Sequence, residues 1–153
     1  MLAVGSPAPD FSLTDDSGET VTLSKLKGTQ VVVYFYPRDD TPGCTTQACG
    51  VRDAWDAFTA AGALVLGVSP DGEASHAKFK AKFELPFTLL SDADHAVAEQ
   101  YGAWGEKSMY GKKYMGVIRS TVVIAADGTV KAIFPKVQPA AHAKLVLAAL
   151  KAA

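Results

Sequence analysis

Two short runs of apolar residues, 31–36 and 64–68, are rich in β-branched side chains, and each is followed by a segment with helical signals. Such runs are typical of strands that are buried on both faces of a sheet. Helices are predicted over 41–61 and 73–83, because turn residues bound apolar positions at helical spacing there. Alternation of strand and helix favours an α/β fold with a parallel core.

The remaining segments add antiparallel strands and further helices. β-Hairpins are predicted over 11–23, at the N-terminus, and over 119–134, around an Asp-Gly turn. We expect a short strand at 87–90 and helices at 92–101 and 142–151. The predicted fold class is therefore α/β, with a central mixed β-sheet flanked by helices and an N-terminal β-hairpin.

No repeat or long linker divides the chain, so we expect a single domain over 1–153. One long stretch, 102–116, shows no clear strand or helix pattern and is expected to be irregular. It contains Lys107, Lys112 and Lys113, a small basic group that we interpret as solvated surface.

The 153 residues are 48% hydrophobic and 20% charged, with a formal net charge of −1. This composition excludes a disordered chain, and the near-neutral charge offers no attraction for nucleic acid or acidic membranes. No apolar run reaches the roughly 18 residues that span a bilayer, and the N-terminus lacks the basic and apolar regions of a secretory signal. We therefore expect a soluble, cytoplasmic protein with reduced cysteines.

The most informative residue is Cys44, which falls in the first turn of the predicted helix 41–61. Thr41 suits the N-cap and Pro42 the first helical position, which places Cys44 third in the helix. Free backbone N–H groups and the positive end of the helix dipole at this position favour a thiolate over a thiol. Cys44 is therefore a candidate reactive cysteine.

The second cysteine, Cys49, lies five residues further along the same predicted helix. In a continuous helix this spacing separates the Cα atoms by about 8.6 Å and points the side chains about 140° apart. A disulfide requires Cα atoms within about 7 Å, so the two cysteines cannot bond while the helix is intact. Oxidation of Cys44 to a sulfenic acid could trap an unwound form as a Cys44–Cys49 disulfide.

Three alternatives compete with this redox interpretation. A cysteine on a core face is often only an inert small hydrophobic residue. A zinc site needs ligands at characteristic spacings, and two cysteines with His76, His95 and His142 match none of them, so we expect no metal and no cofactor. A cysteine acyl-transfer enzyme needs a general base, and no histidine is placed near Cys44 in the sequence.

The segment around Cys44 resembles the signature of a known family. Pro37, Thr41 and Cys44 match the peroxiredoxin signature P-x-x-x-T/S-x-x-C. The C-T-x-x-A-C spacing, the start GSPAPDF at 5–11, and WGEK at 104–107 with Arg119 are similar to the bacterioferritin comigratory protein, or Q-type, subfamily. The resemblance extends from about residue 5 to the C-terminal helix.

The resemblance implies a thioredoxin-like fold and a thiol peroxidase that reduces hydrogen peroxide and organic hydroperoxides. It implies Cys44 as the peroxidatic cysteine, Cys49 as the resolving cysteine, and thioredoxin or a similar dithiol protein as the reductant. Thr41 would bond the peroxide oxygens, Arg119 would hold the thiolate, and Pro37 would shield the pocket. The alternative is a redox sensor or binding module on the same scaffold. In the absence of any recognisable interface, a monomer is expected.

Overall fold

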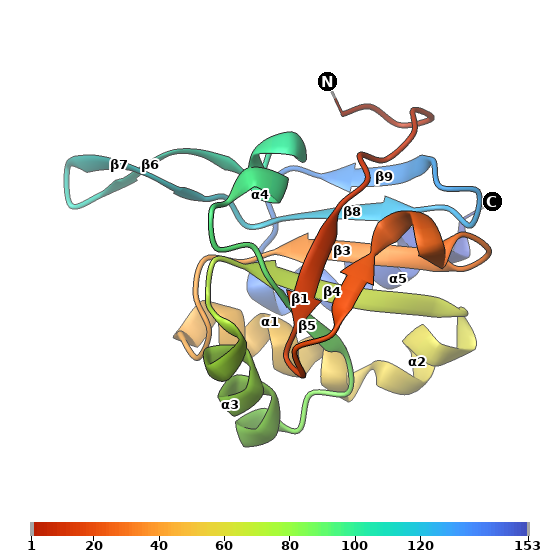
Figure 1. Cartoon of the computed structure of the whole chain (residues 1–153), viewed down its shortest axis with the longest axis horizontal. Helices are drawn as coiled ribbons and strands as arrows, with labels where there is room; N and C mark the ends of the chain where they lie inside the picture. Colours follow the sequence, from red (N-terminus) through yellow and green to blue (C-terminus); the bar gives the residue numbers. More distant parts are fainter. Residues whose placement is uncertain (1, 153) are drawn as a thin grey trace.

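The computed structural model describes residues 2–152, so the two terminal positions of the predicted domain 1–153 lie outside it. Its main sheet contains β1 (Ser12–Asp15), β2 (Thr20–Thr22), β3 (Gln30–Phe35), β4 (Ala63–Ser69), β5 (Thr88–Ser91), β8 (Ser120–Ile124) and β9 (Val130–Phe134). These seven strands lie in the order β2-β1-β5-β4-β3-β8-β9 (Figure 1). Strands β3, β4 and β5 are parallel, whereas β1 and β8 pair antiparallel to them, so the predicted mixed sheet is confirmed.

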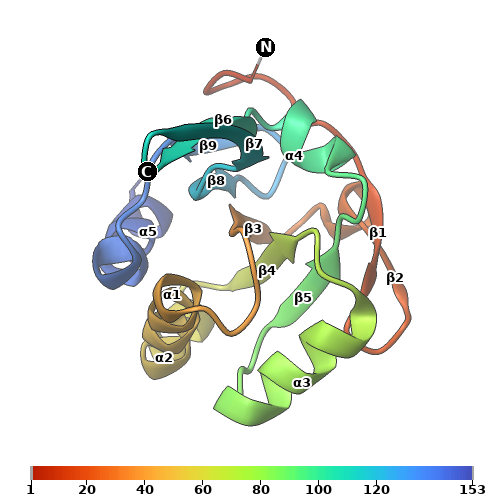
Figure 2. The same cartoon turned by 90° about the vertical axis from the view of Figure 1, so that its left-hand side faces the viewer.

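The helices are α1 (Pro42–Asp53), α2 (Trp55–Ala60), α3 (Glu73–Phe83), α4 (Ala96–Gln100) and α5 (His142–Lys151), with short 3₁₀ turns η1 (Leu23–Leu26) and η2 (Pro139–Ala141). Alternate side chains of β3 supply two cores, as expected for a strand buried on both faces. Val32 and Tyr34 pack with α1, α2, α3 and α5, whereas Val31 and Val33 pack with α4 and the N-terminal segment. Figure 2 shows α4 on the side of the sheet away from α1, α2 and α3. Within residues 2–152, no helix is long and apolar enough to cross a membrane.

Most predicted elements are present with ends close to those expected. The N-terminal hairpin, the buried strands and the β8–β9 hairpin all form, and α3 and α5 begin and end as predicted. The α/β class is therefore confirmed. Three segments differ from the prediction.

The helix predicted over 41–61 is interrupted at Ala54, where φ is −100° and ψ is 14°. The Ala54 N–H is shared between the carbonyls of Gly50 and Val51, each at 3.2 Å, and α2 then starts with Trp55. The Trp55 ring stacks on Phe58, with ring centroids 6.3 Å apart. Alanine is a strong helix former, so the sequence offers no signal for this break.

The stretch 102–116, predicted to be irregular, instead forms a two-stranded hairpin of β6 (Trp104–Met109) and β7 (Lys112–Val117). Its turn residues Tyr110 and Gly111 have φ values of 52° and 78°, so both occupy the left-handed region that a two-residue hairpin turn requires. The hairpin projects from the body of the molecule (Figure 1). Polar residues at strand positions hid the usual alternation.

The helix predicted over 92–101 is shorter, because α4 begins only at Ala96. The buried carboxylate of Asp92 accepts hydrogen bonds from the N–H groups of Val97 at 3.2 Å and Ala98 at 2.9 Å. His95, directly before the helix, has a φ of 50°. The residues between Asp92 and the helix therefore form a turn that the carboxylate closes.

Candidate active site

Cys44 lies just after the loop that connects β3 to α1. The strand ends at Phe35, the loop 36–41 follows, and α1 starts at Pro42, so that Cys44 occupies the predicted third helical position. The first backbone bond of the helix runs from the Thr45 N–H to the Thr41 carbonyl at 2.8 Å. The N–H groups of Gly43 and Cys44 therefore precede the hydrogen-bond ladder of the helix, at its positive end. Only 1% of Cys44 is exposed.

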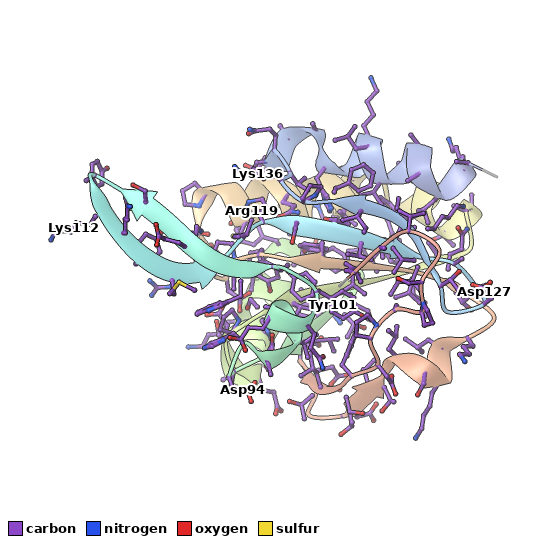
Figure 3. The ribbon with its side chains drawn as sticks, turned by 90° about the horizontal axis from the view of Figure 1, so that it is seen from above. Asp94, Tyr101, Lys112, Arg119, Asp127 and Lys136 are labelled. Carbon is purple, nitrogen blue, oxygen red and sulfur yellow. The ribbon has the colours of Figure 1, made fainter. Side chains whose placement is uncertain are left out.

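Arg119 brings a positive charge to the sulfur from the other side of the site. Its Nη2 donates to Cys44 Sγ at 3.3 Å, although the two residues lie 75 positions apart. Arg119 precedes β8, and Figure 3 shows it near the base of the β6–β7 hairpin, whose turn end bears Lys112. The mixed sheet thus joins two segments that sequence analysis could link only by resemblance.

Gln47 is a site residue that the sequence analysis missed. Its Oε1 accepts from Arg119 Nη1 at 2.6 Å, so the guanidinium is held by Gln47 and Cys44 together. Gln47 is fully buried and lies three residues after Cys44, on the same face of α1. A polar residue at this spacing on the core face of the helix was the signal that could have identified Gln47 from the sequence. A neutral partner orients the guanidinium without cancelling its charge.

Thr41 occupies the predicted N-cap position through its backbone, but its side chain does not cap the helix. The Thr41 hydroxyl donates instead to the Arg38 carbonyl at 2.9 Å. A hydroxyl whose proton is committed in this way presents its lone pairs as an acceptor. Pro37 lies half-buried in the same loop, directly after Tyr36.

Cys49 is half-buried on the same helix, and both cysteines are free thiols. This agrees with the predicted separation of their side chains in an intact helix. Arg52, near Cys49, donates to the Phe83 carbonyl at 2.8 Å and so ties the end of α1 to the end of α3. A bond between the two sulfurs therefore requires α1 to unwind.

Lys107 corrects one sequence expectation, because it is half-buried rather than solvated. Its Nζ donates to the Val117 carbonyl at 3.0 Å. Burial lowers the pKa of Lys107, and the charge of Arg119 lowers it further, against a smaller opposite effect of Cys44. Lys112 and Lys113, near the hairpin turn, are exposed as predicted.

Among the described residues, no histidine hydrogen-bonds Cys44. His142 is buried, and its Nε2 pairs with Thr121 Oγ1 at 2.8 Å. Burial, with a further contribution from the charge of Arg119, lowers the pKa of His142 to about 4. The side chain that hydrogen-bonds Cys44 Sγ is Arg119. Across residues 2–152, no cluster of three or more His, Cys, Asp or Glu side chains could hold a metal ion.

Comparison with known proteins decides the family. A family profile described as AhpC/TSA matches residues 4–133. The chain belongs to the AhpC/TSA family. Within that family, it is 49% identical over 149 residues to a putative peroxiredoxin bcp of Coxiella burnetii, covering 97% of this chain and 99% of the relative. It is also 49% identical over 150 residues to peroxiredoxin Bcp of Escherichia coli K12, covering 98% and 96%.

Solved structures of AhpC/TSA relatives agree with this assignment. A structure of the Xanthomonas campestris bacterioferritin comigratory protein, described for the alkyl peroxide reduction activity of that protein, superposes with a TM-score of 0.90 at 40% identity. It covers 97% of this chain and 98% of that one. A Xylella fastidiosa PrxQ mutant gives a TM-score of 0.92 at 32% identity, covering 99% and 96%.

The predicted resemblance to Q-type peroxiredoxins, the thioredoxin-like fold and the thiol peroxidase class are therefore confirmed. A peroxide substrate and a thiol reductant follow from this family. The structure brings Cys44, Arg119 and Gln47 into contact and places Thr41 and Pro37 in the adjoining loop. The individual catalytic roles of the five predicted residues stay predictions.

Proposed function

We propose that this peroxiredoxin reduces hydrogen peroxide and organic hydroperoxides, with Cys44 as the nucleophile and Cys49 as the resolving cysteine. The observation that supports this most strongly is the contact of Arg119 with Cys44 Sγ at 3.3 Å, at the amino end of α1. A cation therefore contacts a buried sulfur in the first turn of a helix, where the backbone N–H groups lie at the positive end of the helix dipole. The reported alkyl peroxide reduction activity of the X. campestris relative supports organic hydroperoxides as substrates.

In the first step, the Cys44 thiolate attacks the terminal oxygen of the hydroperoxide. The S–O bond forms, the O–O bond breaks, and the leaving alkoxide or hydroxide takes a proton from water. The products are a Cys44 sulfenic acid and an alcohol or water. In the second step, the Cys49 sulfur displaces hydroxide from the sulfenic acid, the proton of Cys49 completes a water molecule, and a Cys44–Cys49 disulfide remains.

Thiolate formation alone explains little of the rate. For any cysteine at pH 7, lowering the pKa from about 8.5 to about 6 raises the thiolate fraction about thirtyfold. The same change lowers the nucleophilicity of each thiolate about thirteenfold, if the slope for disulfide exchange applies to peroxide, so the net gain is about twofold. Catalysis must therefore come from donors that stabilise the transition state.

We assign these donors to Arg119 and the free N–H groups at the start of α1. The guanidinium is held by Gln47 before the reaction begins, so it needs no reorganisation when charge moves onto the oxygens. The Thr41 hydroxyl donates to Arg38 and can accept the proton of the incoming hydroperoxide as a hydrogen bond. Pro37 limits access of water from the loop side.

A dithiol protein of the thioredoxin type would complete the cycle. It gives two electrons and two protons to the disulfide, which restores both thiols and leaves the partner oxidised. We further propose that the chain works in the cytoplasm as a single-domain monomer over 1–153, because both cysteines of the cycle lie in one helix. Cytoplasmic reductants keep such thiols reduced between turnovers.

Mass analysis of the reduced protein before and after one equivalent of hydrogen peroxide tests the proposal, with peptide mapping of wild type and Cys49→Ser. We expect rapid loss of both thiols in wild type as a Cys44–Cys49 disulfide, and a sulfenic acid on Cys44 in the variant. Slow oxidation, or oxidation that starts at Cys49, would contradict it. Rapid oxidation that a thioredoxin system cannot recycle would instead indicate a redox sensor.

A further inference from the structure

A buried polar network fixes the loop between β3 and α1. The Asp39 carboxylate accepts three hydrogen bonds, from the Tyr36 hydroxyl at 2.6 Å, Ser75 Oγ at 2.8 Å and His76 Nδ1 at 2.7 Å. His76 is fully buried, and Asp39 is 8% exposed. Ser75 and His76 belong to α3, so this helix is bonded through its side chains to the loop that precedes Cys44.

Both ring nitrogens of His76 face acceptors. Nδ1 lies 2.7 Å from Asp39 Oδ2, and Nε2 lies 2.9 Å from the Leu90 carbonyl oxygen. An acceptor at each nitrogen favours a proton on each, so the ring is an imidazolium below its pKa. Burial alone would lower the pKa of His76, but the hydrogen bond and charge of Asp39 outweigh burial and raise it. Asp39 and His76 therefore form a buried ion pair.

The backbone of the loop is anchored at the same point. The Asp39 N–H donates to Asp71 Oδ2 at 2.8 Å, and Ser69 Oγ donates to the same oxygen at 2.7 Å. The next residue, Asp40, has a φ of 56°, in the left-handed region that is strained for a residue other than glycine. Such a conformation persists only when its surroundings hold it: the contacts of Asp39 fix the preceding residue, and Lys82 Nζ pairs with the Asp40 carboxylate at 2.7 Å.

We propose that Asp39 and His76 are positioning residues, which hold the loop in the form that presents Cys44 to Arg119 and keep the start of α1 wound until Cys44 is oxidised. This inference rests on the proposed function. The first turn of α1 must unwind before Cys49 reaches Cys44, and every contact that fixes the loop opposes that motion. The pair therefore sets the balance between a wound state that reacts with peroxide and an unwound state that forms the disulfide.

The charge of the pair makes this balance depend on pH. His76 is faced by Asp39 from the loop, Asp71 from the turn before α3, the Tyr36 hydroxyl after β3 and the Leu90 carbonyl of β5. As pH rises through the raised pKa of His76, the ring loses one of its two protons. Either Asp39 or the Leu90 carbonyl then no longer receives a hydrogen bond from the ring. The hydrogen bonds of His76 therefore hold the loop at lower pH and weaken as pH rises, and their loss favours unwinding of the first turn of α1.

Two replacements of His76 separate its two bonds. His76→Asn places an amide near Nδ1 and can still donate to Asp39, whereas His76→Gln places an amide near Nε2 and can still donate to the Leu90 carbonyl. Lys82→Gln is the matched control, because it removes an exposed ion pair of 2.7 Å to Asp40 in the same loop and leaves the buried pair intact. Ser75→Ala removes only one donor to Asp39 and is a milder variant if His76→Gln fails to fold.

Hydrogen exchange of the reduced proteins tests the inference without peroxide. We expect exchange in peptides of α1 to rise at least about tenfold in His76→Gln, less in His76→Asn and Ser75→Ala, and little in Lys82→Gln, with β3 and β4 unchanged. After correction for intrinsic exchange, opening of α1 should increase with pH in wild type and lose that dependence in His76→Gln. Unchanged exchange in α1, or an equal rise throughout the protein, would overturn the inference.

Stopped-flow kinetics give the second readout. His76→Gln should react with peroxide at least about tenfold more slowly but form the disulfide faster once Cys44 is oxidised. A purely structural role would slow both steps or neither, and that result would count against positioning. Failure of wild type to form the disulfide would contradict the proposed function instead, and the exchange data would still judge the role of the pair in holding α1.

Discussion

At the scale of single residues, Arg119 has the clearest catalytic consequence. We expect Arg119→Ala to slow the reaction with peroxide by about 100-fold or more, as loss of a fixed oxyanion donor does elsewhere. The thiolate fraction, followed by ultraviolet absorbance against pH, should change far less. Arg38→Ala is the control, because that exposed side chain lies in the same loop. An equal loss of the rate with peroxide and of the thiolate fraction would contradict the role of Arg119 in stabilising the transition state.

Gln47 should act through Arg119. In Gln47→Ala the guanidinium loses its 2.6 Å partner, so we expect the rate with peroxide to fall about tenfold, at the lower end of the cost of one hydrogen bond to a charged group. Gln47→Glu retains an acceptor and should stay closer to wild type. Stopped-flow rates of the three proteins, with free-thiol counts as a check on the site, measure the difference. An alanine variant as fast as the glutamate variant would assign Gln47 to packing alone.

The residues of the site were predictable only in part. Cys44, Thr41 and Pro37 lie within one short segment, where caps and spacing can be read locally. Gln47 shares the helical face of Cys44 and could have been found by the same reasoning. His76 could not, because its bond to Asp39 joins segments 37 positions apart that meet only in the folded sheet. Arg119 was found by resemblance and not by periodicity.

At the scale of one element, the stability of α1 should control disulfide formation. Gly50 lies within this helix, and a Cβ there would meet only Ala143 Cβ at 4.0 Å. Gly50→Ala should therefore stabilise α1 by about 0.5–1 kcal/mol. Because unwinding precedes the bond between Cys44 and Cys49, the disulfide step should slow by up to about fivefold.

Stopped-flow fluorescence after a peroxide pulse measures that step, and the rate of the preceding attack should not change. Ala148→Gly in the exposed part of α5 is the matched control, because it lowers helix stability away from the cysteines. A disulfide step equally fast in wild type and Gly50→Ala would show that unwinding of α1 does not limit resolution.

Local sequence patterns predicted some of the helices and strands and missed others. The buried strands β3 and β4 were predictable from apolar runs, and α3 from its turn residues. The break falls at Ala54, a strong helix former, and coincides with the stacking of Trp55 on Phe58, a tertiary feature that no turn residue signals. In the β6–β7 hairpin, Tyr110 adopts a left-handed conformation that its side chain does not favour.

At the scale of the whole molecule, His142 should make folding stability depend on pH. Its pKa of about 4 in the folded chain lies below the usual 6.5, so the unfolded chain binds the extra proton first. The contribution of His142 to stability is then complete above about pH 6.5 and is lost as pH falls towards 4, by about 3 kcal/mol. Chemical denaturation across this window measures the effect, and His142→Gln should flatten the curve. An unchanged slope in the variant would assign the acid sensitivity to carboxylates.

The interruption of the helix at Ala54 limits how much of the molecule must rearrange in each turnover. The hydrogen bonds of α2 start anew at Ala54, whose carbonyl accepts from Ala57 and Phe58, so α1 can lose its turns without drawing on those of α2. Phe58 stays buried in the core beneath α2 while the preceding helix rearranges. We therefore expect the redox motion to be confined to the dozen residues of α1, so that recovery after reduction rewinds this helix and returns Cys44, Ala48 and Val51 to a core that the other elements keep in place.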